Sequence, residues 1–304
     1  MRRRMVVGIV IVGGLVLGAG LLVWAGTQGL LGPQAKARHA LGLAEQAIQH
    51  GQWVDAQQTL EAVISAHPDS PWTAQALLKL GRVQEAQQHF VEAKAAYQQL
   101  LDRFSNSPLA AEAQTRLGSV NVVVLFSPTL TDSDVVYRVK PGDTLGGIAR
   151  ATRTTTELLK RANGVSRSTI RPGQQLKIPK GTFKILVDKS HNQLFLTQEN
   201  HFFKTYSVAT GKDNSTPVGT FNIINKVPNP VWYRQGAAVP PDSPANILGT
   251  RWMGLDKQGY GIHGSVDPGA IGKQVTAGCV RMSNADVEEL FTIVPAGTEV
   301  TIVD

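Results

Sequence analysis

The sequence predicts a multidomain chain: an N-terminal transmembrane helix, all-α repeats, a small α+β domain of strand–helix–helix–strand order, and a mainly-β C-terminal domain. Three observations lead to this fold class. An uncharged apolar run lies near the N-terminus, a helical pattern recurs every 37 residues, and short strand-like runs separated by turn residues fill the last third. The expected segments are 1–34 (membrane segment), 35–118 (repeats), 119–134 (linker opening with a short strand), 135–180 (α+β domain) and 181–304 (β domain).

The N-terminal segment has the pattern of a membrane anchor. Residues 5–31 contain no charged residue, and three arginines, Arg2 to Arg4, precede them. About 20 apolar residues span a bilayer, and cations before the run favour a cytoplasmic N-terminus. We therefore expect a single-pass helix in the cytoplasmic membrane, with the bulk of the chain outside the cytoplasm. The alternative is a cleaved signal peptide and a secreted product, but its apolar region is usually only about 7–15 residues long.

Residues 35–118 are rich in Ala, Gln, Leu and Glu, as expected of helices. Residues match at a spacing of 37, including Trp53 with Phe90 and Ser70-Pro71 with Ser107-Pro108. Each unit fits two helices, with Ser-Pro at the start of a helix, where proline is tolerated. The segment resembles tetratricopeptide repeats, in about two and a half copies. Two roles stay open, docking of a protein partner and a plain spacer.

The positive charge of the chain is concentrated in 135–180. This segment holds ten Lys and Arg against two acidic residues, a net charge of +8, whereas the whole chain carries +7. A compact basic domain suits nucleic acid, but an exported chain meets little of it. We therefore expect no nucleic acid as partner and favour an anionic polymer of the cell envelope.

The same segment has a specific motif pattern. Residues 135–139 and 175–179 are typical of strands, with two short helices between them. Tyr137–Leu145 and Ile170–Pro179 resemble the corresponding parts of a LysM domain. The resemblance implies binding to N-acetylglucosamine-containing glycans, chiefly peptidoglycan. It assigns the glycan-binding groove to Gly142, Asp143, Thr144, Leu145, Ile170, Pro172 and Gly173.

The C-terminal domain contains the only cysteine of the chain, Cys279. A lone thiol forms no internal disulfide, and one Cys with one nearby His, His263, is too few ligands for a closed zinc site. No metal and no other cofactor is expected. Two interpretations remain, a buried inert thiol and a nucleophile. Arg281 favours the nucleophile, because a nearby cation lowers the pKa of a thiol.

Further motifs surround this cysteine in a fixed order. They are Thr210-Gly211, Thr216-Pro217-Val218-Gly219, Asn229-Pro230-Val231-Trp232, Gly249-Thr250-Arg251-Trp252, Gly261-Ile262-His263-Gly264 and Gly278-Cys279-Val280-Arg281-Met282. Together they resemble the L,D-transpeptidase catalytic domain of the YkuD type. The resemblance implies that Cys279 is the nucleophile, that His263 is its base, and that the Gly264 carbonyl orients this histidine. The N–H groups of Gly278 and Cys279 are expected to form the oxyanion hole.

One position departs from the family pattern. Many members have a second histidine where this chain has Ala277, so any substrate contact of that histidine is missing. Four other residues are candidates for substrate contacts: Arg281, Thr276, Tyr260 and Trp252. For Arg281 a structural ion pair is the alternative, and for the two aromatic residues it is a place in the core. A helix is expected over 284–291, with Asn284 as its cap, and the Pro-rich stretch 229–242 is expected to cover the active site.

The resemblance implies a bacterial cell-envelope enzyme that acts on peptidoglycan stem peptides. The thiolate would attack the carbonyl of the third stem residue and release the terminal D-alanine. An amine of a second stem would then resolve the thioester and form a 3-3 cross-link. Two alternatives stay open: an L,D-carboxypeptidase or cross-link hydrolase with water as acceptor, and a non-catalytic wall-binding scaffold.

Overall fold

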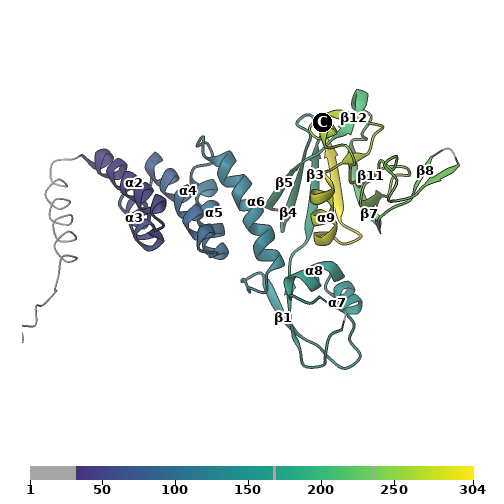
Figure 1. The fold of residues 1–304 in the computed structure, drawn as a ribbon, viewed down its shortest axis with the longest axis horizontal. Coiled ribbons are helices and arrows are strands. Elements are labelled where there is room, and N and C mark those ends of the chain that lie inside the picture. Colours follow the sequence, from purple (N-terminus) through teal and green to yellow (C-terminus); the bar gives the residue numbers. More distant parts are fainter. Residues whose placement is uncertain (1–31, 167–168, 235) are drawn as a thin grey trace, which may run out of the picture.

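The computed structural model describes residues 32–166, 169–234 and 236–304. Helices occupy the N-terminal part of this region, and a β-sheet occupies the C-terminal part (Figure 1). The helices are α2 (Pro33–Gln49), α3 (Trp53–Ala66), α4 (Pro71–Ala86), α5 (Phe90–Arg103) and α6 (Ala110–Phe126). Each packs against the next, and α3 and α5 begin at the matched residues Trp53 and Phe90. The two-helix repeat is therefore confirmed.

The predicted transmembrane helix falls within residues 1–31, outside the described ranges. In the part of the chain that the structure describes, no helix combines the length and the apolar character that crossing a bilayer requires. The fold class is corrected accordingly. It comprises helical repeats, a small α+β domain and a mainly-β domain, and a transmembrane helix is not among the described elements.

The short strand expected at the start of 119–134 is also wrong, because α6 continues to Phe126. Its apolar residues face two cores. Val120 and Val124 pack with α4 and α5, whereas Val122 and Leu125 belong to the core of the β-sheet domain. A helix covered on two sides needs apolar residues all round. This requirement produces the valine-rich run that is typical of a strand.

Helix α6 joins the three parts of the molecule (Figure 1). Asn121 Nδ2 on this helix donates to the carbonyl of Phe203 at 2.8 Å. Lys177, which is buried, donates from Nζ to the carbonyls of Val124, Ser127 and Thr129 at 2.7–3.0 Å. The last carbonyls of a helix lack partners within the helix. Lys177 therefore fastens the small α+β domain to the C-terminal end of α6.

The small domain has the predicted order β1 (Asp134–Arg138), α7 (Leu145–Ala151), α8 (Thr156–Ala162) and β2 (Gln175–Pro179), and its two strands are antiparallel. Thr155 Oγ1, at the start of α8, donates to the carbonyl of Thr292. Leu158 and Ala162 of α8 lie in the core of the β-sheet domain. The small domain is thus packed against the C-terminal domain.

An eight-stranded sheet with strand order β13-β11-β10-β7-β14-β3-β4-β5 forms the C-terminal domain. Its strands are β3 (Phe183–Asp188), β4 (Gln193–Gln198), β5 (His201–Ser207), β7 (Gly219–Pro228), β10 (Arg251–Leu255), β11 (Gly261–His263), β13 (Val280–Arg281) and β14 (Glu299–Val303). Two pairs of neighbours are parallel, β14 with β3 and β11 with β13. The strand-like runs predicted for the last third of the chain are confirmed, whereas the sequence does not predict this strand order.

Smaller elements flank the sheet. They are β6 (Thr210–Gly211), which pairs with β12 (Gln274–Thr276), the hairpin β8 (Trp232–Arg234) with β9 (Ala237–Val239), the 3-10 turns η1 (Lys212–Asn214) and η2 (Pro268–Ala270), and helix α9 (Asn284–Ile293). The β8 hairpin projects from the domain (Figure 1). Helix α9 buries Val287 and Leu290 against the sheet. Its N-cap is Ser283, whose hydroxyl accepts the Asp286 N–H, so the prediction of Asn284 as cap is wrong.

Candidate active site

The side chains predicted for catalysis and substrate contact surround one cleft of about 880 Å³. This is a size that suits a small-molecule or peptide segment. The lining residues are Asn225, Val227, Asn229, Pro230, Val231, Trp232, Tyr233, Ile247, Leu248, Trp252, Gly259, Tyr260, His263, Thr276, Ala277, Cys279 and Arg281. No acidic residue is among the described residues of this lining, whereas a guanidinium group is present. The cleft therefore favours an anionic ligand.

Two parallel strands bring the nucleophile candidate and the base candidate together. In the β11–β13 pair, Ile262 lies opposite Val280 and His263 opposite Arg281. Cys279 lies directly before β13 and lines the same cleft as His263. The fifteen residues between Cys279 and His263 leave β11 and return through β12. A parallel pair requires such a crossover, and so the two residues are close in space but separated in sequence.

His263 is held in one orientation and is 2% exposed. Its Nδ1 donates to the carbonyl of Gly264 at 2.7 Å, and the indole of Trp252 stacks on the ring. A carbonyl only accepts hydrogen bonds, so Nδ1 carries the proton and Nε2 of the neutral ring keeps its lone pair. Burial lowers the pKa of His263 to about 4, assisted by Arg281 and opposed by backbone hydrogen bonds at Gly264 and Leu248. The imidazole is therefore a neutral base at pH 7.

Cys279 is a neutral thiol in this structure. Burial raises its pKa above the ordinary value and outweighs the lowering by a backbone hydrogen bond at Gly261 and by Arg281. Arg281 lowers the pKa of the thiol, as expected, but burial outweighs it and the net shift is upward. Sγ donates to the carbonyl of Gly259 at 3.6 Å, and no hydrogen bond between the described residues joins it to His263. Such bonds are often loose before substrate binds.

The turn before the nucleophile is fixed by Thr276. Its Oγ1 accepts the Gly278 N–H at 3.1 Å and donates to the Cys279 carbonyl at 2.7 Å. Thr276 is predicted to contact substrate. In the structure it is buried, and its hydroxyl stabilises the turn. One of the two expected oxyanion-hole donors, Gly278 N–H, is therefore engaged. No hydrogen bond among the described residues uses the Cys279 N–H.

The backbone conformation at position 278 also requires glycine. Its φ is +132°, and a Cβ at this position would lie 2.7 Å from Cε1 of Tyr260. Only glycine combines such a backbone with so close a neighbour. Tyr260 therefore packs over the turn as well as lining the cleft.

Arg281 lines the cleft without an acidic partner. Among the described residues no salt bridge involves it, and its Nε is buried without a hydrogen bond. The alternative of a structural ion pair is therefore not supported by any described carboxylate. Ala277 is exposed at the edge of the cleft.

The predicted glycan-binding residues lie in two neighbouring loops, because Gly173 N–H donates to the carbonyl of Val139. Gly142, Thr144, Pro172 and Gly173 are exposed, and Asp143 and Ile170 are half-buried. Thr144 caps α7, since its Oγ1 accepts the Gly147 N–H. Leu145 is 3% exposed and lies in the core of the domain, so its side chain does not face a ligand.

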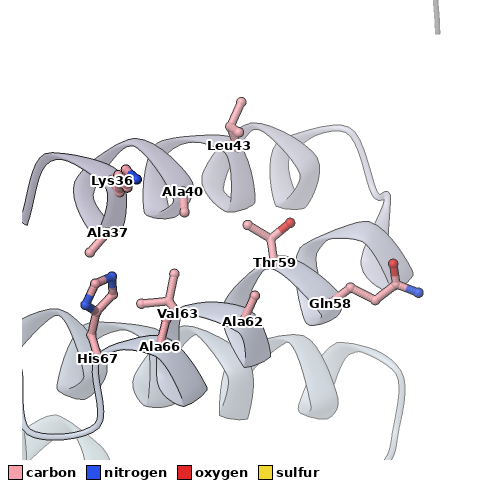
Figure 2. Close-up of a pocket in the computed structure, with 10 residues that line it drawn as sticks. All are labelled: Lys36, Ala37, Ala40, Leu43, Gln58, Thr59, Ala62, Val63, Ala66 and His67. Carbon is pink, nitrogen blue, oxygen red and sulfur yellow. The ribbon is translucent and has the colours of Figure 1, made fainter. Parts of the chain in front are cut away.

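Sequence motifs missed part of the cleft. The Pro-rich stretch was expected to cover the site, and its segment 229–233 does line it. Asn225, Ile247 and Leu248 carry no motif signal and reach the cleft only through the sheet order. A second groove, of about 440 Å³, lies between α2 and α3, where mainly small side chains face one another (Figure 2). None of the residues predicted for catalysis lines it, and it is not the candidate active site.

Comparisons with known proteins agree with the motifs. Family models match residues 182–302 (L,D-transpeptidase catalytic domain), 137–179 (LysM domain) and 34–106 (tetratricopeptide repeat). A putative L,D-transpeptidase YkuD of Bacillus licheniformis is 40% identical over 176 residues, which cover 55% of this chain and 98% of that protein. The putative YkuD of Bacillus subtilis strain 168 is 40% identical over 175 residues, with the same coverage.

Among solved structures, an L,D-transpeptidase from Mycobacterium smegmatis is 18% identical with a TM-score of 0.35. The match covers 43% of this chain and 64% of that one, slightly less than two thirds of its length. The protein from B. licheniformis is matched over nearly its whole length at an identity that establishes kinship. The chain therefore belongs to the YkuD-type L,D-transpeptidase family, as a peptidoglycan-related transpeptidase with a LysM domain and tetratricopeptide repeats.

Proposed function

We propose that this chain forms 3-3 cross-links between peptidoglycan stem peptides through a thioester on Cys279. The observation that carries the proposal is that Cys279 and His263 line the same cleft, which has no described acidic lining residue. The fixed tautomer of His263 supports its role as base, because Nε2 is the nitrogen free to accept a proton.

The acylation step begins from a neutral pair. Sγ leaves the carbonyl of Gly259 and turns toward His263, where Nε2 takes its proton as sulfur bonds to the carbonyl carbon of the third stem residue. Because the thiol pKa is raised and the imidazole pKa is lowered, we expect this transfer to accompany the attack rather than precede it. When the amide bond breaks, the imidazolium returns the proton to the departing D-alanine amine.

The second step reverses these roles. The amine of another stem attacks the thioester carbonyl and gives a proton to His263, and sulfur leaves with the bonding pair. The proton then returns to the thiolate, and a new amide bond links the two stems. Water in place of the amine would give the carboxypeptidase or hydrolase reaction.

The Cys279 N–H is the donor that supports the oxyanion in both steps. One such donor is typically worth about 2.7–4 kcal/mol in the transition state. Gly278 N–H would add a second donor only after its bond to Thr276 Oγ1 breaks.

Arg281 is proposed to bind a carboxylate of the stem, since charge-assisted hydrogen bonds are strong in a desolvated site. Arg281→Gln is expected to raise KM more than it lowers kcat for a tetrapeptide stem. An unchanged KM would remove this role.

The exposed loops 142–144 and 170–173 are proposed to hold the glycan strand while the cleft takes the stem. We propose a location in the cell envelope, outside the cytoplasm, because peptidoglycan lies there.

The test is product analysis. The full chain is incubated with disaccharide-tetrapeptides, and the products are separated and weighed by mass spectrometry. We expect dimers with a 3-3 linkage, and none with Cys279→Ala. Tripeptides without dimers would favour the hydrolytic alternative, and no product at all would favour the scaffold.

A further inference from the structure

Asn284, the first residue of α9, directs its side-chain oxygen back toward the loops beside the cleft. Oδ1 accepts hydrogen bonds from Thr250 N–H at 3.1 Å and from Ser265 N–H at 3.2 Å. Since Ser283 caps the helix, these bonds are not part of a helix cap. They tie the start of α9 to the residues just before β10 and just after β11.

Two glycines make room for this oxygen. A Cβ added to Gly249 would lie 2.3 Å from Asn284 Oδ1, and one added to Gly264 would lie 2.2 Å from it. Both distances are well inside van der Waals contact. The cradle therefore accepts the amide oxygen only because neither residue has a side chain.

One peptide group connects Asn284 to the base. The N–H of Ser265 and the C=O of Gly264 belong to the same planar unit. The N–H donates to Asn284 Oδ1, and the C=O accepts from His263 Nδ1 at 2.7 Å. Fixing one end of this unit fixes the direction of the other, and hydrogen bonds in a chain polarise one another.

We propose that Asn284 is a positioning residue for His263. By holding the Gly264–Ser265 peptide, Asn284 holds the imidazole in the tautomer that leaves Nε2 free. Asn284 is not among the residues that line the cleft. The effect on turnover rests on the proposed function of His263, whereas the effect on the tautomer does not.

Variants of the full chain test this role with two readouts. The first is the rate of acylation by a disaccharide-tetrapeptide. The second is the ¹⁵N spectrum of the histidine rings, with the His263 signal assigned by comparison with His263→Gln. Asn284→Ala loses the acceptor, whereas the carboxylate of Asn284→Asp can accept both bonds. Asn163→Ala is the matched control, because it removes three hydrogen bonds between an asparagine side chain and backbone in the LysM domain.

We expect Asn284→Ala to slow acylation about 10- to 100-fold, the usual effect of a displaced catalytic group. Its His263 signal should change from the Nδ1–H form to a mixture of tautomers. Asn284→Asp should keep the tautomer and acylate within about tenfold of the wild-type rate, with its acid limb at higher pH because an added negative charge raises the pKa of His263. Asn163→Ala should leave the tautomer and the rate unchanged.

An unchanged tautomer in Asn284→Ala would overturn the proposal, as would equal losses of rate in the Ala and Asp variants. If Asn284→Ala does not fold, Asn284→Ser, too short to reach both N–H groups, replaces it with the same expected results. Failure of the wild-type protein to acylate would refute the proposed function, and the tautomer would still decide the role of Asn284.

Discussion

The indole of Trp252 stacks on the imidazole of His263, with ring centroids 5.9 Å apart and an angle of 23° between the planes. The two residues lie opposite each other on the antiparallel strands β10 and β11. The indole thus packs on one face of the imidazole while the Gly264 carbonyl binds one edge. This packing also keeps water from the ring and contributes to its lowered pKa.

Replacement of Trp252 should therefore impair the action of His263 as base more than it destabilises the fold. Trp252→Ala is expected to lower the acylation rate about tenfold or more, because a displaced base is costly. Trp252→Phe should retain most of the rate. Trp72→Ala, which removes an indole from the repeat helices, is the matched control and should leave the rate unchanged. Equal rates for Trp252→Ala and wild type would contradict this role.

The pH profile follows from the lowered pKa of His263. The acid limb of kcat/KM should lie near pH 4 instead of 6.5, because the free base persists down to that pH. An acid limb near pH 6.5 would contradict the lowered pKa of His263.

The stability of the fold should also depend on the lowered pKa of His263. The folded state binds fewer protons than the unfolded state between pH 4 and 6.5, so the free energy of unfolding rises with pH across this window. The rise, measured by denaturant unfolding, should be smaller in His263→Gln. Equal slopes of the free energy of unfolding against pH in the wild type and in His263→Gln would contradict the lowered pKa of His263.

Gly278 should not tolerate a side chain. Gly278→Ala combines an unfavourable backbone with a contact of 2.7 Å to the Tyr260 ring, so we expect about 1–3 kcal/mol of destabilisation and a large loss of acylation. Gly272 also has a positive φ, of +85°, but no atom lies within 4 Å of an added Cβ, so Gly272→Ala should be destabilised less and remain active. Thermal unfolding and acylation rates of the two variants decide between these expectations, and equal behaviour would reject the steric argument.

Lys177 should be essential for the packing of the LysM domain against α6. Lys177→Met leaves Asp134, 3.4 Å from Nζ, without its buried cation and removes the hydrogen bonds from Nζ to three carbonyls. Breaking a buried pair typically costs about 3–5 kcal/mol. Lys180→Met, at an exposed position, is the control. Denaturant unfolding should show a large loss for Lys177→Met alone, and a loss below about 1 kcal/mol would contradict the packing described.

Local patterns in the sequence predicted those elements that bury a single face against one neighbour. The LysM domain follows from alternating strands and turn residues, and the repeat follows from pairs such as Trp53 and Phe90. The pattern failed where one element meets two neighbours. The valines of α6 suggest a strand because this helix is covered on two sides, a fact of tertiary packing.

The candidate site shows the same limit. Motifs identified Cys279, His263 and the glycine turns, because few residue types serve that chemistry. The sequence suggested Asn284 only as a helix cap, because its two acceptor bonds depend on how α9 meets β10 and β11. The motifs also misjudged the net pKa of the thiol, because a nearby cation is visible in sequence and desolvation is not.

The account depends on sulfur as the group that bonds to the stem peptide. The most direct test is intact-protein mass spectrometry after brief incubation of the full chain with a disaccharide-tetrapeptide. We predict an adduct equal in mass to the stem without its terminal D-alanine, located on Cys279 by peptide mapping and absent from Cys279→Ala. An adduct of equal yield on Cys279→Ala, or turnover by that variant, would contradict the account.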